Sequence, residues 1–278
     1  MRPVEIRFGD LRLEGWSRAG DETWVRVHPP GLAFDVGRGA LQLAGAQDVF
    51  LTHGHLDHAL GLPYVLSQRS LHRLVHTRVF CPAEIVEPMR AFIQAAEAIE
   101  NARYRYDLLP LVPGDRVPVG RDLTIEAFRT DHVVPSLGYH LWRSKRRLAA
   151  EYAGLPAEEL IALRQRGVDT SETLEELWLS YCGDTAQGVF DLEPRVFESK
   201  VLVLECTFLG DAHRDKGDRF KHLHLEDIEA RAERFRNQAL VLQHLSRRHK
   251  VAELRAAVDQ RMPELAPRVH LMVEEETA

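Results

Sequence analysis

The chain has 278 residues, of which 45% are hydrophobic and 28% are charged. This length and composition suit one large domain or two small ones, each with a substantial core. With 36 basic and 42 acidic residues the formal net charge is −6, which argues against nucleic-acid binding through bulk charge. A polyanionic substrate would have to be held by a local basic patch or by bound cations.

Several classes of protein are disfavoured by composition. No apolar run approaches the ~20 residues of a membrane-spanning helix, and residues 1–10 lack the apolar stretch of a signal peptide. The three cysteines, Cys81, Cys182 and Cys206, are widely spaced and odd in number. This count excludes a disulfide framework and is typical of a reducing compartment. We therefore expect a cytoplasmic protein without membrane association.

The first half of the chain is dominated by predicted strands. Residues 4–8, 11–16 and 23–28 alternate apolar and polar side chains, whereas residues 31–36 and 47–52 are more continuously apolar, as buried central strands are. Apolar spacing and helix-terminal residues predict helices at 89–99, 156–166, 225–235 and 251–262. Because strands and helices alternate in the second half, we expect sheets covered by helices in one layered domain.

Five predicted strands each end at a side chain that can bind a metal ion or transfer a proton. These strand ends carry His53, Asp131 with His132, Asp184, Glu205 and His244. Ligand sites in such folds gather at the carboxyl ends of strands. We therefore expect these side chains to lie together.

The densest cluster is the segment that contains His53, His55, Asp57 and His58. Imidazole and carboxylate ligands suit zinc, manganese or iron better than calcium or magnesium. His53 and His55 could reach one ion together, while Asp57 and His58, at the start of the next helix, could face a second. The alternative is a solvated loop with scattered histidines, and the density of the cluster after a buried strand argues against it.

The spacing His53-x-His55-x-Asp57-His58 resembles the signature of the metallo-β-lactamase superfamily. Further motifs are similar to ribonuclease Z in particular. They are His132 with Pro135, Gly138 and Tyr139; Gly183-Asp184-Thr185; Glu205; His222; and His244-x-Ser246-x-Arg248. Over its whole length the chain is most similar to the short, plant-type form of tRNase Z.

This resemblance implies an α/β fold of the metallo-β-lactamase αββα type, with two mixed β-sheets flanked by helices. It implies one domain over residues 1–278 with a short charged helical insertion at about 141–177. It also implies two divalent metal ions that share Asp184, with zinc favoured and manganese or iron as alternatives. The two ligand sets would be His53, His55, His132 and Asp184, and Asp57, His58, His244 and Asp184.

The resemblance also assigns roles around these ligands. Asp35 is similar to a strand-end aspartate of the family that would orient a ligand histidine, with an ordinary turn aspartate as the alternative. Paired ions would activate a shared water for in-line attack on phosphorus, and Asp57 could take its proton. Glu205 would orient His222 as the acid for the leaving 3′-oxygen, with His224 in reserve.

Ser246 and Arg248 would act on the substrate side, Ser246 by positioning the His244 segment and Arg248 by neutralising a phosphate. A helix cap and a solvated charge are the alternatives. Two basic clusters, one with Arg143, Lys145, Arg146 and Arg147 and one with Arg214, Lys216, Arg219 and Lys221, flank predicted site residues. Contact with RNA and a solvated surface are both compatible with them.

The function implied is a metal-dependent endoribonuclease that removes 3′ trailers from precursor tRNA. In ribonuclease Z relatives an insertion after the Gly-Tyr turn holds the tRNA elbow, and relatives act as homodimers, which we expect here by resemblance. Residues 141–177 lack the Gly/Pro-rich arm of many bacterial members. The alternatives are therefore a hydrolase of the same fold for a small phosphodiester or ester, and a non-catalytic RNA-binding protein, against which the intact ligand set argues.

Other candidate residues have simpler interpretations. His140 is predicted to face away from His132, and Cys182 and Cys206 are predicted to be small core residues. Histidines outside the motifs are predicted to be surface or packing residues, namely His28, His72, His76, His213, His249 and His270.

Overall fold

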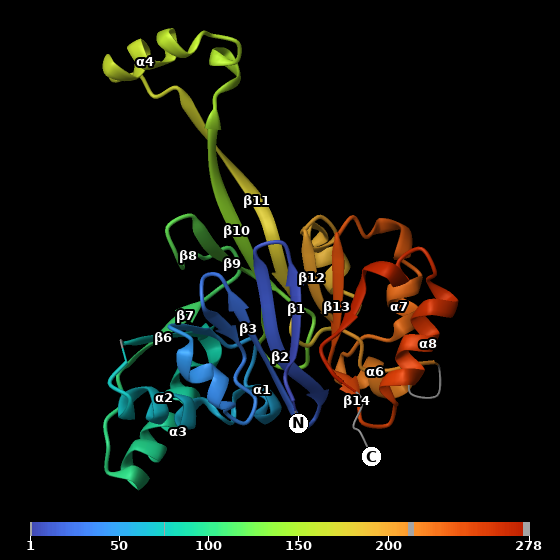
Figure 1. Cartoon of the computed structure of the whole chain (residues 1–278). Coiled ribbons are helices and arrows are strands. Elements are labelled where there is room, and N and C mark those ends of the chain that lie inside the picture. The colour runs from blue at the N-terminus through green and yellow to red at the C-terminus, as the bar shows by residue number, and fades with distance from the viewer. Residues whose placement is uncertain (1, 75, 211–213, 275–278) are drawn as a thin grey trace.

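The computed structural model describes residues 2–74, 76–210 and 214–274. Two mixed β-sheets pack face to face, and helices cover the outer face of each sheet (Figure 1). This arrangement confirms the predicted α/β class and its αββα layering. Among the described residues, no helix combines the length and apolar character needed to cross a bilayer.

The first sheet has eight strands in the order β1-β2-β3-β4-β5-β6-β7, with β14 beside β2. Its strands are β1 (Val4–Phe8), β2 (Leu11–Ala19), β3 (Glu22–His28), β4 (Leu32–Phe34), β5 (Asp48–Phe50), β6 (Thr77–Pro82), β7 (Tyr106–Leu111) and β14 (Leu245–Ser246). Strands β1 to β4 pair antiparallel and β4 to β7 pair parallel. All five strands predicted in the first half are present.

The second sheet has seven strands in the order β15-β13-β12-β11-β10-β9-β8. They are β8 (Arg116–Pro118), β9 (Leu123–Arg129), β10 (Leu137–Leu148), β11 (Ser171–Tyr181), β12 (Val201–Glu205), β13 (Ala239–Gln243) and β15 (Val269–Leu271). Strands β12 and β13 are buried along their whole length, as their uninterrupted apolar sequence predicts for central parallel strands.

Aromatic side chains fill the space between the sheets. Phe34 stacks on Tyr181 with ring centroids 4.6 Å apart, and the Tyr139 hydroxyl donates to the Leu51 carbonyl at 2.6 Å. These contacts join β4 and the end of β5 to β10 and β11, so the two sheets are fixed to each other where their strands end. Such packing gives the loops beyond those ends a rigid base.

The helices cover the outer faces of the sheets, except for the one over Ala157–Gln165, which lies apart from the body of the molecule (Figure 1). They are α1 (Leu56–Ala59), α2 (Leu62–Leu71), α3 (Val86–Glu100), α4 (Ala157–Gln165), α5 (Val189–Leu192), α6 (Arg214–Phe220), α7 (Leu225–Glu229) and α8 (Val251–Arg261). The helix predicted at 225–235 is wrong in length, because α7 ends at Glu229. The chain leaves the helix there and buries Phe235 against Phe190 and Phe197.

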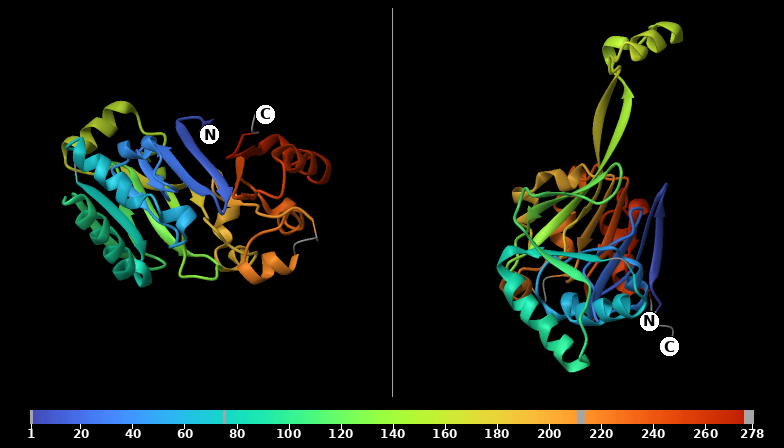
Figure 2. Two further views of the ribbon diagram at one scale, coloured as in Figure 1. Left: turned by 90° about the horizontal axis from the view of Figure 1, so that it is seen from below. Right: turned by 90° about the vertical axis from the view of Figure 1, so that its left-hand side faces the viewer.

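Strands β10 and β11 continue beyond the sheet as a projecting arm (Figures 1 and 2). They stay paired from Tyr139↔Tyr181 to Leu148↔Ser171, and the arm ends in a tip that contains α4. Where the sequence predicted a helical insertion over 141–177, residues 141–148 and 171–177 are strands and the helix is confined to the tip. Opposite charges across the ladder, such as Arg147 and Glu172 at 2.7 Å, are typical of stable strand pairs.

The Gly138→Ala variant tests the packing of β10 against β9 inside the second sheet. A Cβ at Gly138 would lie 2.2 Å from the Phe128 ring of the neighbouring strand, whereas a Cβ at Gly120 meets neighbours only at 3.6 Å or more. We expect Gly138→Ala to lower the free energy of unfolding by about 1–3 kcal/mol because it overpacks the sheet. Gly120→Ala is the matched control in denaturant unfolding, and equal stability of the two variants would contradict this packing.

Candidate metal centre

The predicted strand-end residues meet at one edge of the two sheets. The loop with His53 and His55 follows β5, His132 follows β9, and Asp184 follows β11, while Glu205 ends β12 and His244 follows β13. The hydrogen bond from the Leu137 amide to the Thr52 carbonyl, 2.9 Å long, joins the start of β10 to the β5 loop. Residues nearly 200 positions apart in the sequence therefore face one another across this edge.

Three groups of side chains there could each hold a cation. Within each group the ligand atoms lie within 4.8 Å of one another. The groups are His53, His55, His132 and Asp184; Asp57, His58 and His244; and Asp184, Glu205, His222 and His244. The first group is the first predicted ligand set, and the second group is the second predicted set without Asp184. The third group brings Glu205 and His222 next to Asp184 and His244.

Asp184 lies between the first two groups. Its carboxylate oxygens are 3.7 Å from His53 Nε2, 3.3 Å from His58 Nε2 and 3.3 Å from His244 Nε2. A carboxylate in this position can bridge two cations that would otherwise repel each other. The arrangement therefore matches a shared ligand.

The orientation of the buried polar atoms fits bound cations. His53 Nε2, His58 Nε2, His244 Nε2 and Asp184 Oδ1 are buried, and none has a hydrogen-bond partner among the described residues. Buried polar atoms without partners are costly, and several that converge on one space suit a bound cation. Imidazole nitrogens with one carboxylate form a donor set suited to zinc and related ions.

A threonine and an aspartate fix the histidines of the first loop. Thr52 Oγ1 lies 2.9 Å from Asp35 Oδ2 and 2.9 Å from His53 Nδ1. Because a carboxylate can only accept, the Thr52 hydroxyl donates to Asp35 and accepts from His53 Nδ1–H. Asp35 also accepts from His58 Nδ1 at 2.8 Å. Nδ1 of both rings is thereby engaged, so Nε2 of each ring faces Asp184.

The same device recurs on the opposite side of the site. Thr207 Oγ1 donates to Glu205 Oε2 at 2.6 Å and lies 2.9 Å from His244 Nδ1. Glu205 Oε1 accepts from His222 Nδ1 at 2.9 Å. One buried carboxylate therefore orients both His222 and, through Thr207, His244.

Electrostatics reinforce these assignments. Burial lowers the pKa of His53 well below its ordinary value and also lowers the pKa of His132, which favours the neutral, ligating form of both rings. Burial would raise the pKa of Asp184, but His244 and His58 hold it well below its usual range. Asp184 therefore stays ionised in the centre of the site.

His222 differs from the other histidines of the site. Burial would lower its pKa, but the Glu205 carboxylate outweighs burial and raises the pKa to about 9. The side chain is 14% exposed, and its ring lies 5.3 Å from that of His132. His222 is therefore a protonated imidazole at neutral pH at the margin of the cluster, which is the form a general acid needs.

The backbone around the site is strained at three non-glycine residues. Asp35, Lys221 and His244 have φ angles of 54°, 56° and 60°. Such conformations cost roughly 1–3 kcal/mol each and persist where surrounding contacts impose them. Gly183, with φ 62°, has a different constraint, because a Cβ there would lie 2.7 Å from Thr52 and would push Asp184 away from the β5 loop.

Several predicted residues lie outside the cluster. His224 is fully buried and stacks on Phe208 at 5.1 Å, so it does not replace His222. Ser246 is buried and lies 3.4 Å from Arg248 Nη1, whereas Arg248 itself is exposed. His140 is buried on the second sheet, where Nδ1 lies 2.8 Å from Ser180 Oγ. Cys182 and Cys206 are buried, and His213 is outside the described residues.

Of the two basic clusters that the sequence offered for RNA contact, the one with Arg214 and Lys221 lies at α6, where Arg214 pairs with Asp227 and Lys221 with Asp131. The other lies on the arm and is also paired with acids. Lys145 lies 2.9 Å from Glu176, Arg146 lies 2.6 Å from Asp169, and Arg147 pairs with Glu172. All three side chains are exposed, and exposed pairs of this kind exchange partners at little cost.

Sequence reasoning missed Thr52, Thr207 and Tyr181 as parts of the site. Tyr181 donates from its hydroxyl to Asp35 Oδ2 at 3.3 Å. Thr52 directly precedes His53 at the end of a predicted strand, and Thr207 lies two residues after Glu205, where another strand ends. Their position at the strand ends was the available signal. Hydroxyl side chains are common at such places for turn formation alone, so the signal is weak.

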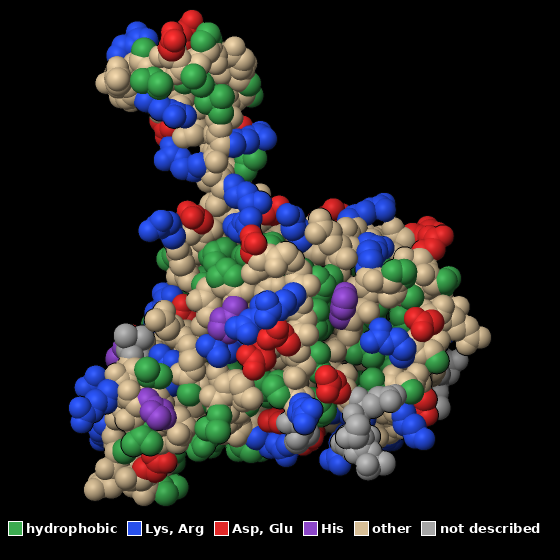
Figure 3. Space-filling view, viewed as in Figure 1, with side chains coloured by type: hydrophobic (Ala, Val, Ile, Leu, Met, Phe, Trp, Pro, Cys, Tyr) green, Lys and Arg blue, Asp and Glu red, His purple; other side chains and the backbone are tan. Residues whose placement is uncertain are grey.

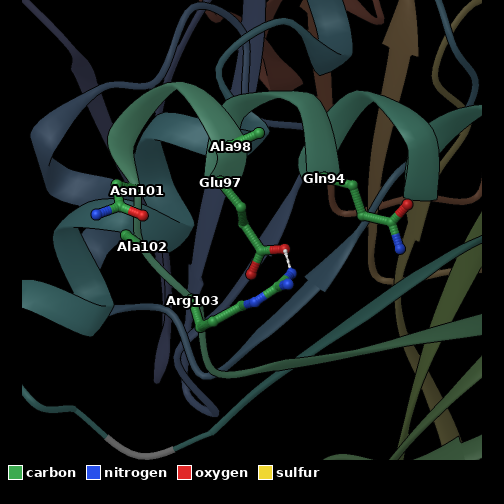
Figure 4. Close-up of a pocket in the computed structure, with 6 residues that line it drawn as sticks. All are labelled: Gln94, Glu97, Ala98, Asn101, Ala102 and Arg103. Carbon is green, nitrogen blue, oxygen red and sulfur yellow. Dashed lines mark hydrogen bonds and ion pairs between the residues drawn. The ribbon is translucent and has the colours of Figure 1, made fainter.

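A separate hollow at the end of α3 does not share this chemistry. Its lining includes Glu97 and Arg103, which form an ion pair of 3.1 Å (Figure 4). Glu97 also accepts from the Tyr104 amide at 2.7 Å. Glu97 therefore stabilises the end of α3 and the turn that follows it.

The Asp35→Asn variant tests the orientation of the histidines. An amide cannot accept from Thr52 and His58 as the carboxylate does, so we expect affinity for divalent metal to fall by about 10- to 100-fold. Competition with a chelator measures this affinity, and Asp48→Asn, which alters a buried carboxylate at the other end of β5, is the matched control. Equal metal affinity of Asp35→Asn and the unaltered protein would refute the assigned role.

Comparison with known proteins agrees with this geometry. A model of the beta-lactamase superfamily domain matches residues 30–245. The chain is 31% identical over 265 residues to tRNase Z TRZ1 of Arabidopsis thaliana, an alignment that covers 94% of this chain and 95% of that protein. It is 37% identical over 163 residues to a nuclear ribonuclease Z of Triticum aestivum, covering 58% of this chain and 92% of that one.

Solved structures show the same fold. The metallo-beta-lactamase fold protein YhfI of Bacillus subtilis superposes with a TM-score of 0.67 at 15% identity, covering 96% of this chain and 98% of that one. The short form of human tRNase Z (ELAC1) superposes with a TM-score of 0.56 at 20% identity, covering 99% and 94%. The fold and its His/Asp clusters imply divalent metal binding. The chain belongs to the metallo-β-lactamase superfamily and, within it, to the tRNase Z family.

Proposed function

We propose that this protein is a metal-dependent endoribonuclease that removes 3′ trailers from precursor tRNA. The observation that carries the proposal is the placement of a Glu205–His222 acid pair beside two ligand groups, with Asp184 between them. The similarity to tRNase Z TRZ1 over 94% of the chain supports the same substrate class.

We propose two zinc ions as occupants, one at His53, His55, His132 and Asp184 and one at Asp57, His58, His244 and Asp184. The imidazole-rich donor set supports zinc. Bound there, the ions would activate water and neutralise charge on the phosphodiester.

The side chains of the chain supply the proton transfers. Burial would raise the pKa of Asp57, but His244 and His58 lower it, and its Oδ2 accepts from the Gly20 amide at 2.8 Å. Asp57 is thus a fixed, ionised acceptor for the proton of the attacking water. His222, held through Nδ1 by Glu205, presents Nε2 as the donor to the leaving 3′-oxygen. We propose that Arg248, which is exposed, neutralises a neighbouring phosphate.

The arm supports a substrate larger than the reaction centre. No residue of α4 is buried, and Ile161 at the tip is 53% exposed. The space-filling view shows hydrophobic side chains on the tip among charges of both signs (Figure 3). A short helix without buried residues needs a partner for stability. We propose that the tip contacts base faces of the tRNA, which apolar side chains can stack against.

The position of the arm supports action as a homodimer. Strand β10 starts beside Thr52 at the reaction centre and has 12 residues, so the tip is about 40 Å away at ~3.4 Å per residue. It points away from the metal edge (Figure 2). We propose that the arm of one subunit holds the tRNA cleaved by the other, as a C2 pair allows.

A hydrolase of small phosphodiesters remains the second candidate, and it is favoured by one observation. Lys145, Arg146 and Arg147 of the arm are each paired with an acid, which reduces the charge that these three residues offer to RNA.

The His222→Ala variant tests the acid. Cleavage of a precursor tRNA at the trailer junction should slow by roughly 100- to 10,000-fold because the 3′-oxygen is a poor leaving group without a proton. Hydrolysis of bis-p-nitrophenyl phosphate should fall much less, since nitrophenolate leaves unprotonated. His270→Ala is the control histidine variant, and elemental analysis should find the metal content unchanged. Loss of metal from His222→Ala would instead make His222 a ligand.

Removal of the arm tests the substrate. Replacing residues 145–174 with Asn-Gly should lower precursor cleavage by about 100-fold or more through loss of a second contact, with little change for bis-p-nitrophenyl phosphate.

In the protein with its arm intact, the triple variant K145Q/R146Q/R147Q should weaken precursor binding and flatten its salt dependence if these residues contact phosphates. An enzyme that hydrolyses the small diester but never cuts the precursor would establish the second candidate.

A further inference from the structure

An apolar pocket opens directly beside the reaction centre. It has a volume of about 350 Å³ and lies between α1, α3 and the loop that follows His132. Its walls include His55 and Leu56 on one side, Met89 and Phe92 on another, and Pro135 on a third. His55 belongs to the first ligand group, so the pocket is continuous with that group.

The chemistry of the walls selects a flat, uncharged occupant. Apart from His55, no described residue that lines the pocket carries a titratable side chain. A phosphate would find no counter-charge there. Phe92 offers an aromatic face and Met89 a polarisable thioether, and both suit stacking with a π-system. Leu56 is 64% exposed at the rim, so the mouth of the pocket is apolar as well.

We propose that this pocket binds the base of the first trailer nucleotide, on the 3′ side of the cleaved bond. The inference rests on the proposed function, which places the leaving 3′-oxygen at His222. The His132 ring lies 5.3 Å from the His222 ring and 5.0 Å from the His55 ring. His222 itself does not line the pocket. The nucleotide that keeps the 3′-oxygen therefore lies toward His222, and the nucleotide joined through its 5′-oxygen lies toward His55 and the pocket.

A pocket of this kind would bind any base. Stacking on an aromatic side chain is available to every base, because every base has a π-face. The described lining offers no charged group and only the His55 ring and backbone for polar contact with a base edge. The base is therefore held without being identified, as an enzyme acting on many precursors requires.

Paired changes in enzyme and substrate test the proposal. Phe92→Ala should lower kcat/KM for a precursor tRNA by about tenfold, the order expected for one stacked base. An abasic first trailer nucleotide should do the same to the unaltered enzyme, and the two changes combined should cost no more than either alone. Ile99→Ala is the matched control, because Ile99 is an apolar residue of the same helix that is 86% exposed and outside the pocket. Independent, additive losses would overturn the assignment, as would coupling of Phe92 to the nucleotide on the 5′ side instead.

A binding measurement separates this proposal from the proposed function. A short single-stranded RNA with one 2-aminopurine should lose fluorescence on binding the unaltered protein and Ile99→Ala, and should keep it with Phe92→Ala. Equal quenching by all three proteins would overturn the pocket even if precursor tRNA is cleaved. Quenching that depends on Phe92, together with absence of precursor cleavage, would sustain the pocket while the tRNA assignment fails. A change of oligomeric state in Phe92→Ala on size-exclusion chromatography would assign the pocket to a partner chain and would also overturn the proposal.

Discussion

The structure depends on a buried carboxylate, Asp184, that is surrounded by imidazoles. Asp184 is 2% exposed, and three histidine Nε2 atoms face it within 3.7 Å. An ionised group withdrawn from water in this way needs opposite charge and directed partners. The strand ends of both sheets converge on it, so the position of Asp184 and the packing of the sheets constrain each other.

Two similar relays hold the surrounding histidines. In each, a carboxylate accepts from a threonine hydroxyl, and the hydroxyl accepts from a histidine Nδ1. The carboxylates also bind a second histidine directly, His58 in one case and His222 in the other. Because Glu205 serves both His244 and His222, the ligand side and the acid side of the site are mechanically linked. Outer partners of this kind determine tautomer and ring orientation.

One pair of strands, β10 and β11, connects the reaction centre to the arm. Strands β10 and β11 begin or end at the reaction centre, pass through the core with Tyr139 and Tyr181, and leave the body as the arm. A rigid core between the two ends lets the tip vary in sequence without disturbing the site. The predicted insertion at about 141–177 is present, with its predicted helix at the tip as α4, and cross-strand ion pairs extend the ladder on either side of that helix.

The sequence by itself determined the strands of the first half and the candidate residues at strand ends, since these follow from local periodicity and from polar residues that interrupt buried strands. The αββα layering was implied by the resemblance of the His53 motif to the metallo-β-lactamase superfamily. Only the tertiary structure decided that Thr207 bonds both Glu205 and His244, that His224 is a core residue, and that Phe92 and His55 share a pocket. Each of these facts concerns a contact between segments remote in sequence, in which ordinary side chains acquire a role through their neighbours. A local sequence pattern determines whether a segment prefers a helix or a strand. Which side chains then meet across the site depends on how the two sheets pack.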